Sequence, residues 1–236
     1  MHPLLTALLL LLPIIALLVW ELYVCEGAHF GPRFVTLLYD LSARHYDNIK
    51  QFDEDWEDRF LGEPIHTACT FLDAPLLLDV GAGTARVART LLRSGTFTGT
   101  IINAEPSRRM ITQGSRLVPS HHSVWVNAWS VPLPFPDNTF DMVTCLEILE
   151  FTPSPRGTLR ELVRVLRPGG WLITTNRIGR EAKWILGKTF PREQFTAELQ
   201  AVGLIEIDVL LWQMDYDLAW AQKPPRTPSR HLQPAP

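Results

Sequence analysis

The sequence predicts an α/β fold in which a mostly parallel sheet is covered by helices on both faces. Three observations support this prediction. From residue 76 onward, short apolar segments typical of strands alternate with helical segments. The first strand runs into a glycine-rich turn that opens a helix. The chain has 236 residues, 46% of them hydrophobic, which is enough for one sizeable core and a short appendage.

Each element of this domain has its own signal. The strands are short apolar runs, and the helix before Pro168 is ended by that proline and the two glycines that follow it. The expected strands span residues 76–80, 100–104, 123–127, 142–146, 171–175, 205–212 and 216–222, and the expected helices span residues 85–94, 107–117, 155–166 and 192–202.

The N-terminal segment is far more apolar than the rest of the chain. Pro3 to Trp20 carries no charged residue and, as a helix, would cover roughly 27 Å, close to the thickness of the hydrocarbon layer of a bilayer. We interpret residues 1–21 as an uncleaved membrane anchor, because no Lys or Arg precedes the apolar run and no A-x-A cleavage site follows it. A cleaved signal peptide is the alternative, and Pro13 and the marginal length leave an interfacial arrangement open.

Residues 22–75 are expected to form a helical lid or linker ahead of the main domain. Apolar residues recur there at three- and four-residue spacing, so we expect one stripe that lies on the domain or on a membrane. His45 falls on this stripe, where a core histidine is more common than a catalytic one. The stripe comprises Phe34, Leu37, Leu38, Leu41, His45, Ile49 and Phe52.

Charge and cysteine content exclude several classes of function. A formal net charge of −3 and an isoelectric point near 6.2 argue against nucleic acid as a partner. The three cysteines have no CxxC spacing and no histidines at metal-ligand intervals, so reduced, buried thiols and no metal site are expected. Residues 224–236 are proline-rich and polar, which predicts a disordered tail. The sequence does not indicate an oligomeric state.

A ligand site is predicted where the first strand ends. The stretch LLLDVGAGTAR places Asp79 two residues before Gly81, and Gly83 follows. Glycines at a strand-to-helix junction let a ligand approach the backbone, although a plain tight turn uses the same residues. Arg86 stands where a dinucleotide fingerprint has its third glycine, so a nicotinamide cofactor is disfavoured. Glu105, just past the second strand, is placed to accept hydrogen bonds from ribose hydroxyls or to cap the next helix.

Together with PLPFPDNTFDMV and VLRPGG further along, this turn resembles the class I S-adenosylmethionine-dependent methyltransferases, particularly the methyltransferase type 11 group that includes ubiquinone and menaquinone methyltransferases. The resemblance covers about residues 75–223, and we assign residues 76–223 as the methyltransferase domain. It implies a Rossmann-like seven-stranded sheet whose last strand is inserted antiparallel, and S-adenosyl-L-methionine as the cofactor. The residues it implies for cofactor binding are Asp79, Gly81, Ala82, Gly83, Glu105, Pro106, Asn127, Ala128, Trp129 and Leu146.

This sequence departs from the family pattern at two places. Ala85 replaces a frequent third glycine of the turn. Where relatives usually carry an aspartate toward the adenine amino group, this chain offers Asn127 or, in another alignment, Trp129. An asparagine side-chain oxygen can still accept that hydrogen bond.

The catalytic residues are left unassigned. Methyl transfer from a sulfonium is a direct displacement, so alignment supplies much of the rate and a general base is optional. The candidates are Tyr46, in a segment that resembles the lid helix of quinone-type methyltransferases, and Glu147 and Glu150, beyond the fourth strand. The two glutamates stand at i and i+3, so the start of a solvated helix is the competing interpretation.

The apolar N-terminus favours an acceptor that partitions into a membrane. We therefore expect a hydrophobic or amphipathic small molecule such as a lipid, a quinone or a thiol. The cofactor is made in the cytosol, so the anchored domain is expected to face that side. A catalytically silent, membrane-tethered cofactor-binding or assembly module is the alternative, because no residue in the sequence is an indispensable catalyst.

Overall fold

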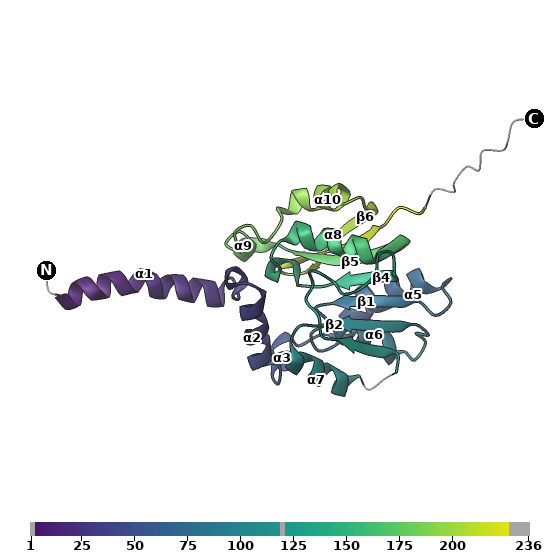
Figure 1. The fold of residues 1–236 in the computed structure, drawn as a ribbon, viewed down its shortest axis with the longest axis horizontal. Helices are drawn as coiled ribbons and strands as arrows, with labels where there is room; N and C mark the ends of the chain where they lie inside the picture. The colour runs from purple at the N-terminus through teal and green to yellow at the C-terminus, as the bar shows by residue number, and fades with distance from the viewer. Residues whose placement is uncertain (1–2, 119–120, 227–236) are drawn as a thin grey trace, which may run out of the picture.

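The computed structural model describes residues 3–118 and 121–226. Within these residues, seven strands form one sheet in the order β3-β2-β1-β4-β5-β7-β6 (Figure 1). Strand β7 is antiparallel to β5 and β6, and the other neighbouring strands are parallel, so the predicted Rossmann-like fold is confirmed. The strands are β1 (Leu76–Val80), β2 (Thr100–Ala104), β3 (Ser123–Val126), β4 (Phe140–Cys145), β5 (Leu166–Arg177), β6 (Ile205–Gln213) and β7 (Tyr216–Gln222).

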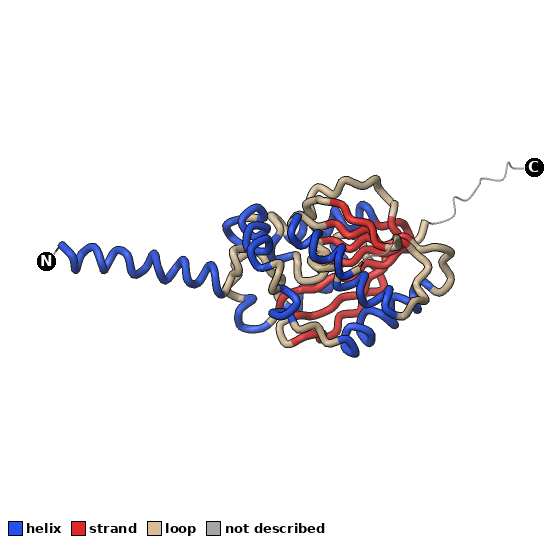
Figure 2. Tube along the Cα trace, turned by 90° about the horizontal axis from the view of Figure 1, so that it is seen from below, coloured by secondary structure: helices blue, strands red, loops and turns tan. Residues whose placement is uncertain are grey.

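Helices cover both faces of this sheet, as Figure 2 shows. The N-terminal helices are α1 (Pro3–Tyr23), η1 (Ala28–Phe30), α2 (Pro32–Ser42), α3 (Tyr46–Lys50), α4 (Glu54–Glu57), η2 (Asp58–Gly62) and α5 (Glu63–Cys69). The helices of the main domain are α6 (Arg86–Arg93), α7 (Arg108–Leu117), η3 (Leu149–Phe151), α8 (Pro155–Val165), α9 (Gly179–Ala182) and α10 (Arg192–Ala201).

The hydrophobic core lies in two layers, one on each face of the sheet. Leu78 and Val80 of β1 pack into the layer that contains α8 and α10, whereas Leu77 packs into the layer that contains α5 and α6. Side chains alternate across a strand, so a strand buried on both faces has an unbroken apolar sequence. The predicted reduced, buried thiols are confirmed for Cys25, Cys69 and Cys145.

Helix α1 projects away from the domain (Figures 1 and 2). No helix in the described part of the chain is both long enough and apolar enough to cross a membrane. From residue 11 onward the helix leaves nine large apolar side chains exposed: Leu11, Leu12, Ile14, Ile15, Leu17, Leu18, Val19, Leu22 and Tyr23.

The apolar stripe predicted for residues 34–52 does not lie on one helix. The chain leaves α2 after Ser42 and begins α3 at Tyr46, and this break changes the direction of the side chains that follow. Val35 of α2 is buried, whereas Leu41 and His45 are exposed, so the assignment of His45 to the core is wrong. Of the predicted tail, residues 224–226 are exposed and without regular structure, and residues 227–236 lie outside the described residues.

Candidate cofactor site

The turn after β1 requires its glycines. Gly81 and Gly83 have φ angles of 71° and 53°, in the left-handed region that residues with a Cβ rarely adopt. A Cβ on Gly81 would lie 2.4 Å from Cδ1 of Ile148, so the turn packs directly against the loop that follows β4. Ala85 is also left-handed, with a φ of 70°, and its methyl group is fully buried. The turn therefore keeps a glycine-like backbone where the sequence has an alanine.

Asp79 lies at the end of β1, buried beneath this turn. The hydroxyl of Thr144 on β4 donates a hydrogen bond of 2.6 Å to its Oδ1. Burial raises the pKa of Asp79 to about 6, against the opposing effects of the Thr144 hydrogen bond and the Arg86 charge. The carboxyl group is therefore buried and poised to ionise close to neutral pH.

Glu105 links the ends of β2 and β1. The backbone N–H of Gly83 donates to Oε2 at 3.0 Å, and the N–H of Ser107 donates to Oε1 at 2.8 Å. Burial raises the pKa of Glu105 to about 7, although both backbone hydrogen bonds favour the ionised form. The N-cap of α7 is Ser107, whose hydroxyl accepts from Met110 N–H, so Glu105 is not needed as the helix cap.

Both acids face one pocket at the carboxyl ends of the parallel strands, where ligands bind in open α/β sheets. Of the ten residues predicted for cofactor binding, eight line it: Asp79, Gly81, Ala82, Gly83, Glu105, Pro106, Trp129 and Leu146. Asn127 and Ala128 do not line it. The Asn127 side-chain amide donates to the carbonyl oxygens of Glu105 and Pro106, so Asn127 holds the loop that carries the acid.

The segment between α2 and α4 covers this pocket. Tyr39, Tyr46 and Phe52 line it, and the hydroxyl of Thr84 in the glycine turn donates to Asp47 Oδ1 at 2.9 Å. Burial raises the pKa of both tyrosines well above the usual range, so both phenols are neutral at physiological pH. The predicted lid position of Tyr46 thus agrees with its place in the pocket.

A buried ion-pair network joins this cover to the domain. Arg86 pairs with Glu57 through Nε and Nη2, at 2.8 and 2.5 Å, and with Glu147 through Nη1, at 2.6 Å. Lys50 Nζ lies 2.5 Å from the other oxygen of Glu147. The Arg86 guanidinium lies 4.3 Å from the ring centroids of both Phe52 and Trp212.

The interpretation of Glu147 and Glu150 as the start of a solvated helix is wrong, because both are buried. Burial would raise the pKa of Glu147, but Lys50 and Arg86 together lower it, so this residue is ionised. Burial raises the pKa of Glu150, which accepts a 2.5 Å hydrogen bond from the Tyr216 hydroxyl and does not line the pocket. Of the three catalytic candidates, Tyr46 and Glu147 reach the site.

The sequence reasoning did not identify the Glu57–Arg86–Glu147 network. Its partners are 29 and 61 residues apart along the chain, so no local pattern reveals the pairing. One signal for the network was present in the sequence: Arg86 stands where a dinucleotide fingerprint has a glycine. An arginine that is buried at such a turn needs acidic partners.

Comparison with known proteins agrees with this geometry. Residues 78–174 match the family model described as a methyltransferase domain. The match covers less than half of the chain and supports a methyltransferase domain in this part of it. The match runs from β1 to β5 and includes both acids and the glycine turn. For this domain, the predicted enzyme class and the predicted cofactor, S-adenosylmethionine, are supported.

Curated relatives of this domain include proteins named demethylmenaquinone methyltransferase. The chain is 38% identical over 97 residues to a demethylmenaquinone methyltransferase of Staphylococcus saprophyticus, covering 41% of this chain and 42% of the relative. It is 33% identical over 144 residues to a demethylmenaquinone methyltransferase of Mycolicibacterium paratuberculosis, covering 61% of this chain and 59% of the relative. The chain thus spans about half the length of the curated relatives it matches.

Solved structures share the fold. The [4+2]-cyclase SpnF has a TM-score of 0.69 at 21% identity, covering 83% of this chain and 97% of the other. A possible histamine N-methyltransferase from Thermotoga maritima has a TM-score of 0.54 at 19% identity, covering 78% and 99%. The first of these is described as a cyclase, so the fold alone does not decide the reaction.

Proposed function

We propose that the chain is an S-adenosylmethionine-dependent methyltransferase that acts on a hydrophobic or amphipathic small molecule. The observation that carries this proposal is the convergence of two buried acids, Asp79 and Glu105, on a glycine turn that faces one pocket. Both acids and the glycine turn lie within the part of the chain matched to the methyltransferase domain. The family match supports the chemistry, and the geometry supports the placement of the cofactor.

The residues present fit this cofactor. Glu105 still has lone pairs for the two ribose hydroxyls while it accepts from Gly83 and Ser107, because an ionised carboxylate has about four acceptor positions. Gly81 and Gly83 line the pocket with backbone alone, where the methionine portion would lie, and Asp79 below them favours a positively charged group. Trp129 and Leu146 supply apolar surface for the base. When bound, this cofactor supplies a methyl group on a positively charged sulfur.

The acceptor would enter on the apolar side of the same pocket. Val35, Tyr39 and Phe151 line that side, and a neighbouring pocket shares Pro32 and Trp129 with it. The cofactor, held by Asp79, Glu105 and the glycine turn, would supply the methyl group to a lone pair of the acceptor. The protein's part is to align acceptor and methyl group and to exclude water.

Proton removal from the acceptor is the one step that a side chain can assist. Glu147 is ionised and lines the pocket, but Arg86 and Lys50 engage both of its oxygens, which weakens it as a base. The phenol of Tyr46 is neutral and serves as a hydrogen-bond donor to the acceptor. We therefore propose that acceptors with an acidic proton, such as phenols, hydroquinones and thiols, react best.

We propose further that the chain associates with a membrane surface and keeps its domain on the cytosolic side. The projecting α1 exposes apolar side chains, and Leu37 and Leu41 of α2 are exposed as well. An apolar acceptor concentrates in the same lipid layer. The names of the relatives, which are demethylmenaquinone methyltransferases, agree with an acceptor of this kind.

The test is transfer of label from cofactor carrying a labelled methyl group. The full chain in lipid vesicles is incubated with a demethylated naphthoquinol, an alkyl thiol or a total lipid extract, and solvent-extractable label is measured. Transfer that is lost in Glu105→Ala supports the proposal. Cofactor binding by calorimetry without transfer to any acceptor class would favour a silent cofactor-binding module.

A further inference from the structure

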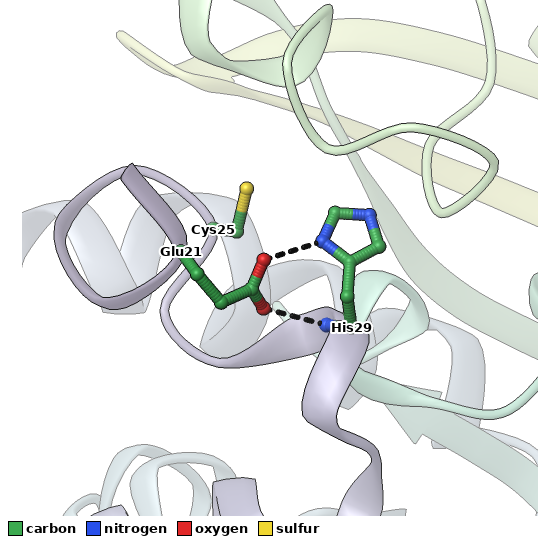
Figure 3. A group of neighbouring side chains, drawn as sticks. All are labelled: Glu21, Cys25 and His29. Carbon is green, nitrogen blue, oxygen red and sulfur yellow. Dashed lines mark hydrogen bonds and ion pairs between the residues drawn. The ribbon is translucent and has the colours of Figure 1, made fainter. Parts of the chain in front are cut away.

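Three potential metal ligands converge where α1 ends. Glu21 lies in the last turn of α1, Cys25 in the turn that follows and His29 in η1 (Figure 3). One ligand atom from each side chain lies within 4.8 Å of the other two. Glu21 and Cys25 are buried, whereas the side chain of His29 is 27% exposed. The group lies outside the cofactor pocket, and the proposed methyl transfer uses none of its members.

The contacts of His29 place a lone pair opposite the carboxylate. Nε2 lies 3.2 Å from the carbonyl oxygen of Leu186, which can only accept, so Nε2 carries a hydrogen. In the neutral ring, Nδ1 then presents its lone pair to Glu21 Oε2, 2.8 Å away. At this distance a proton or a metal ion must lie between the nitrogen and the oxygen.

The second oxygen of Glu21 is fixed by the backbone. The N–H of His29 donates to Oε1 at 2.8 Å, so the carboxylate is oriented before any ion arrives. The carbonyl of Leu186 orients the imidazole in the same way. Ligating histidines almost always donate their other ring N–H to such a group. Both oxygen and nitrogen ligands are therefore preorganised by contacts that a metal would leave in place.

Cys25 supplies the ligand that distinguishes between metals. Its thiol is fully buried and makes one long contact, 3.6 Å, with the carbonyl oxygen of Trp184. A thiolate, an imidazole and a carboxylate around one ion match the ligand set of zinc and not that of calcium or magnesium.

We propose that Glu21, Cys25 and His29 form a zinc site. Zinc would bind Cys25 Sγ, His29 Nδ1 and a Glu21 oxygen (Figure 3), and a water molecule would take the fourth position. The thiol proton passes to solvent as the sulfur–zinc bond forms. Ligand atoms around tetrahedral zinc lie about 3.3 Å or more apart, so the ring withdraws from Oε2 by about half an ångström.

Such a site would fasten α1 to the domain. The three ligands lie at the end of α1 and in η1, and their neighbours Trp184 and Leu186 belong to the segment after α9. A bound ion would fix the direction in which the apolar helix leaves the domain. It is a structural role, independent of methyl transfer.

The test is titration of the full, reduced chain with Co²⁺, which reports thiolate coordination by a near-ultraviolet charge-transfer band and tetrahedral geometry by visible bands. We expect one cobalt per chain, displaced by Zn²⁺. The thiolate band disappears in Cys25→Ser, and cobalt affinity falls at least tenfold in His29→Ala and in Glu21→Gln. Cys69→Ser is the matched control, because Cys69 is also free and buried, and it keeps the band.

Cofactor calorimetry and the far-ultraviolet circular dichroism of each variant show whether the domain has kept its fold. If Cys25→Ser does not fold, His29→Ala decides. No thiolate band at saturating cobalt would show that a proton alone joins His29 to Glu21, and that result would overturn the site. A band of equal strength in wild type and Cys25→Ser would overturn it as well.

Discussion

Arg86 and Glu147 form a buried ion pair, with Nη1 and Oε1 2.6 Å apart, and both residues line the pocket proposed for the cofactor. The same guanidinium holds Glu57 through two further hydrogen bonds. One arginine on α6 therefore fastens the N-terminal cover and the loop after β4 to the glycine turn. Its removal leaves two buried carboxylates without their main partner.

Arg86→Met should lower the free energy of unfolding by about 3–5 kcal/mol, the usual cost of breaking a buried ion pair on one side. Urea unfolding measures this. Arg156→Met is the control, because Arg156 pairs with Glu198 at the exposed surface and its loss should change stability little. Equal effects of the two substitutions would show that the Arg86 network does not stabilise the fold.

Asp79→Ala and Glu105→Ala should each weaken cofactor binding by about 1–3 kcal/mol, the scale for removing the partner of a buried polar group. Isothermal calorimetry with S-adenosylmethionine gives the dissociation constants. Glu193→Ala, at an exposed position on α10, should leave the affinity unchanged. Wild-type affinity in both pocket variants would remove the basis for the site.

Cofactor affinity should depend on pH. The pKa of Glu105 is raised to about 7 and that of Asp79 to about 6, and a cationic, hydroxyl-bearing ligand prefers both in the ionised form. Affinity should therefore be full near pH 8, fall about tenfold per pH unit below 7 and fall more steeply below 6. Calorimetry from pH 5.5 to 8.5 tests this, and Glu105→Gln should remove the dependence between pH 6 and 8. Affinity that stays flat or rises on acidification contradicts the assignment.

Gly81→Ala should lower the free energy of unfolding by more than the strain of an alanine with a left-handed backbone. Its new Cβ would lie 2.4 Å from Ile148, in addition to a φ of 71°. Gly203→Ala isolates the backbone effect, because Gly203 has a φ of 89° and open space around it. We expect about 1–2 kcal/mol for Gly203→Ala and about 2–4 kcal/mol for Gly81→Ala. Thermal unfolding measures both effects. Similar losses of stability in the two variants would mean that the loop after β4 moves aside without cost.

Leu17→Glu should reduce binding of the full chain to phosphatidylcholine vesicles without changing cofactor affinity. Leu17 is exposed on α1, and a charge there opposes insertion of the helix into the lipid surface. Vesicle cosedimentation measures the effect. Phe71→Glu, at an exposed position just after α5, is the control. Equal binding by wild type and Leu17→Glu would contradict membrane association through α1.

Local patterns predicted much of this fold. The bounds of β1 and β2 agree with the predicted segments, because each strand is one apolar run between turn residues. The predicted strand at 171–175 was too short, because β5 begins at Leu166 and pairs with β4 on both sides of a register shift. The segment RPGG lies at this shift and has no strand-like pattern in the sequence. The glycine turn and Glu105 could be identified from the sequence because each directly follows a predicted strand, where ligands bind in such sheets.

Other features depend on contacts that no local pattern encodes. The burial of Glu147 follows from Arg86 and Lys50, which come from distant parts of the chain. The exposure of His45 follows from the break between α2 and α3. The three- and four-residue periodicity assumes one continuous helix and so does not predict this break. The convergence of Glu21 with His29 requires the turn at residues 24–27, where the chain leaves the direction of α1.

The two backbone contacts of Glu105 have a consequence for how the pocket recognises its guest. Because Gly83 and Ser107 already hold both carboxylate oxygens, the side chain has settled into one rotamer before anything arrives. Binding of a ribose there costs little side-chain entropy. It avoids roughly the 0.5–1.5 kcal/mol that ordering a mobile side chain would cost. The pocket then selects ligands by the positions of their ribose hydroxyls. A nucleoside that lacks one of these hydroxyls loses a hydrogen bond that the fixed carboxylate cannot replace by changing its rotamer.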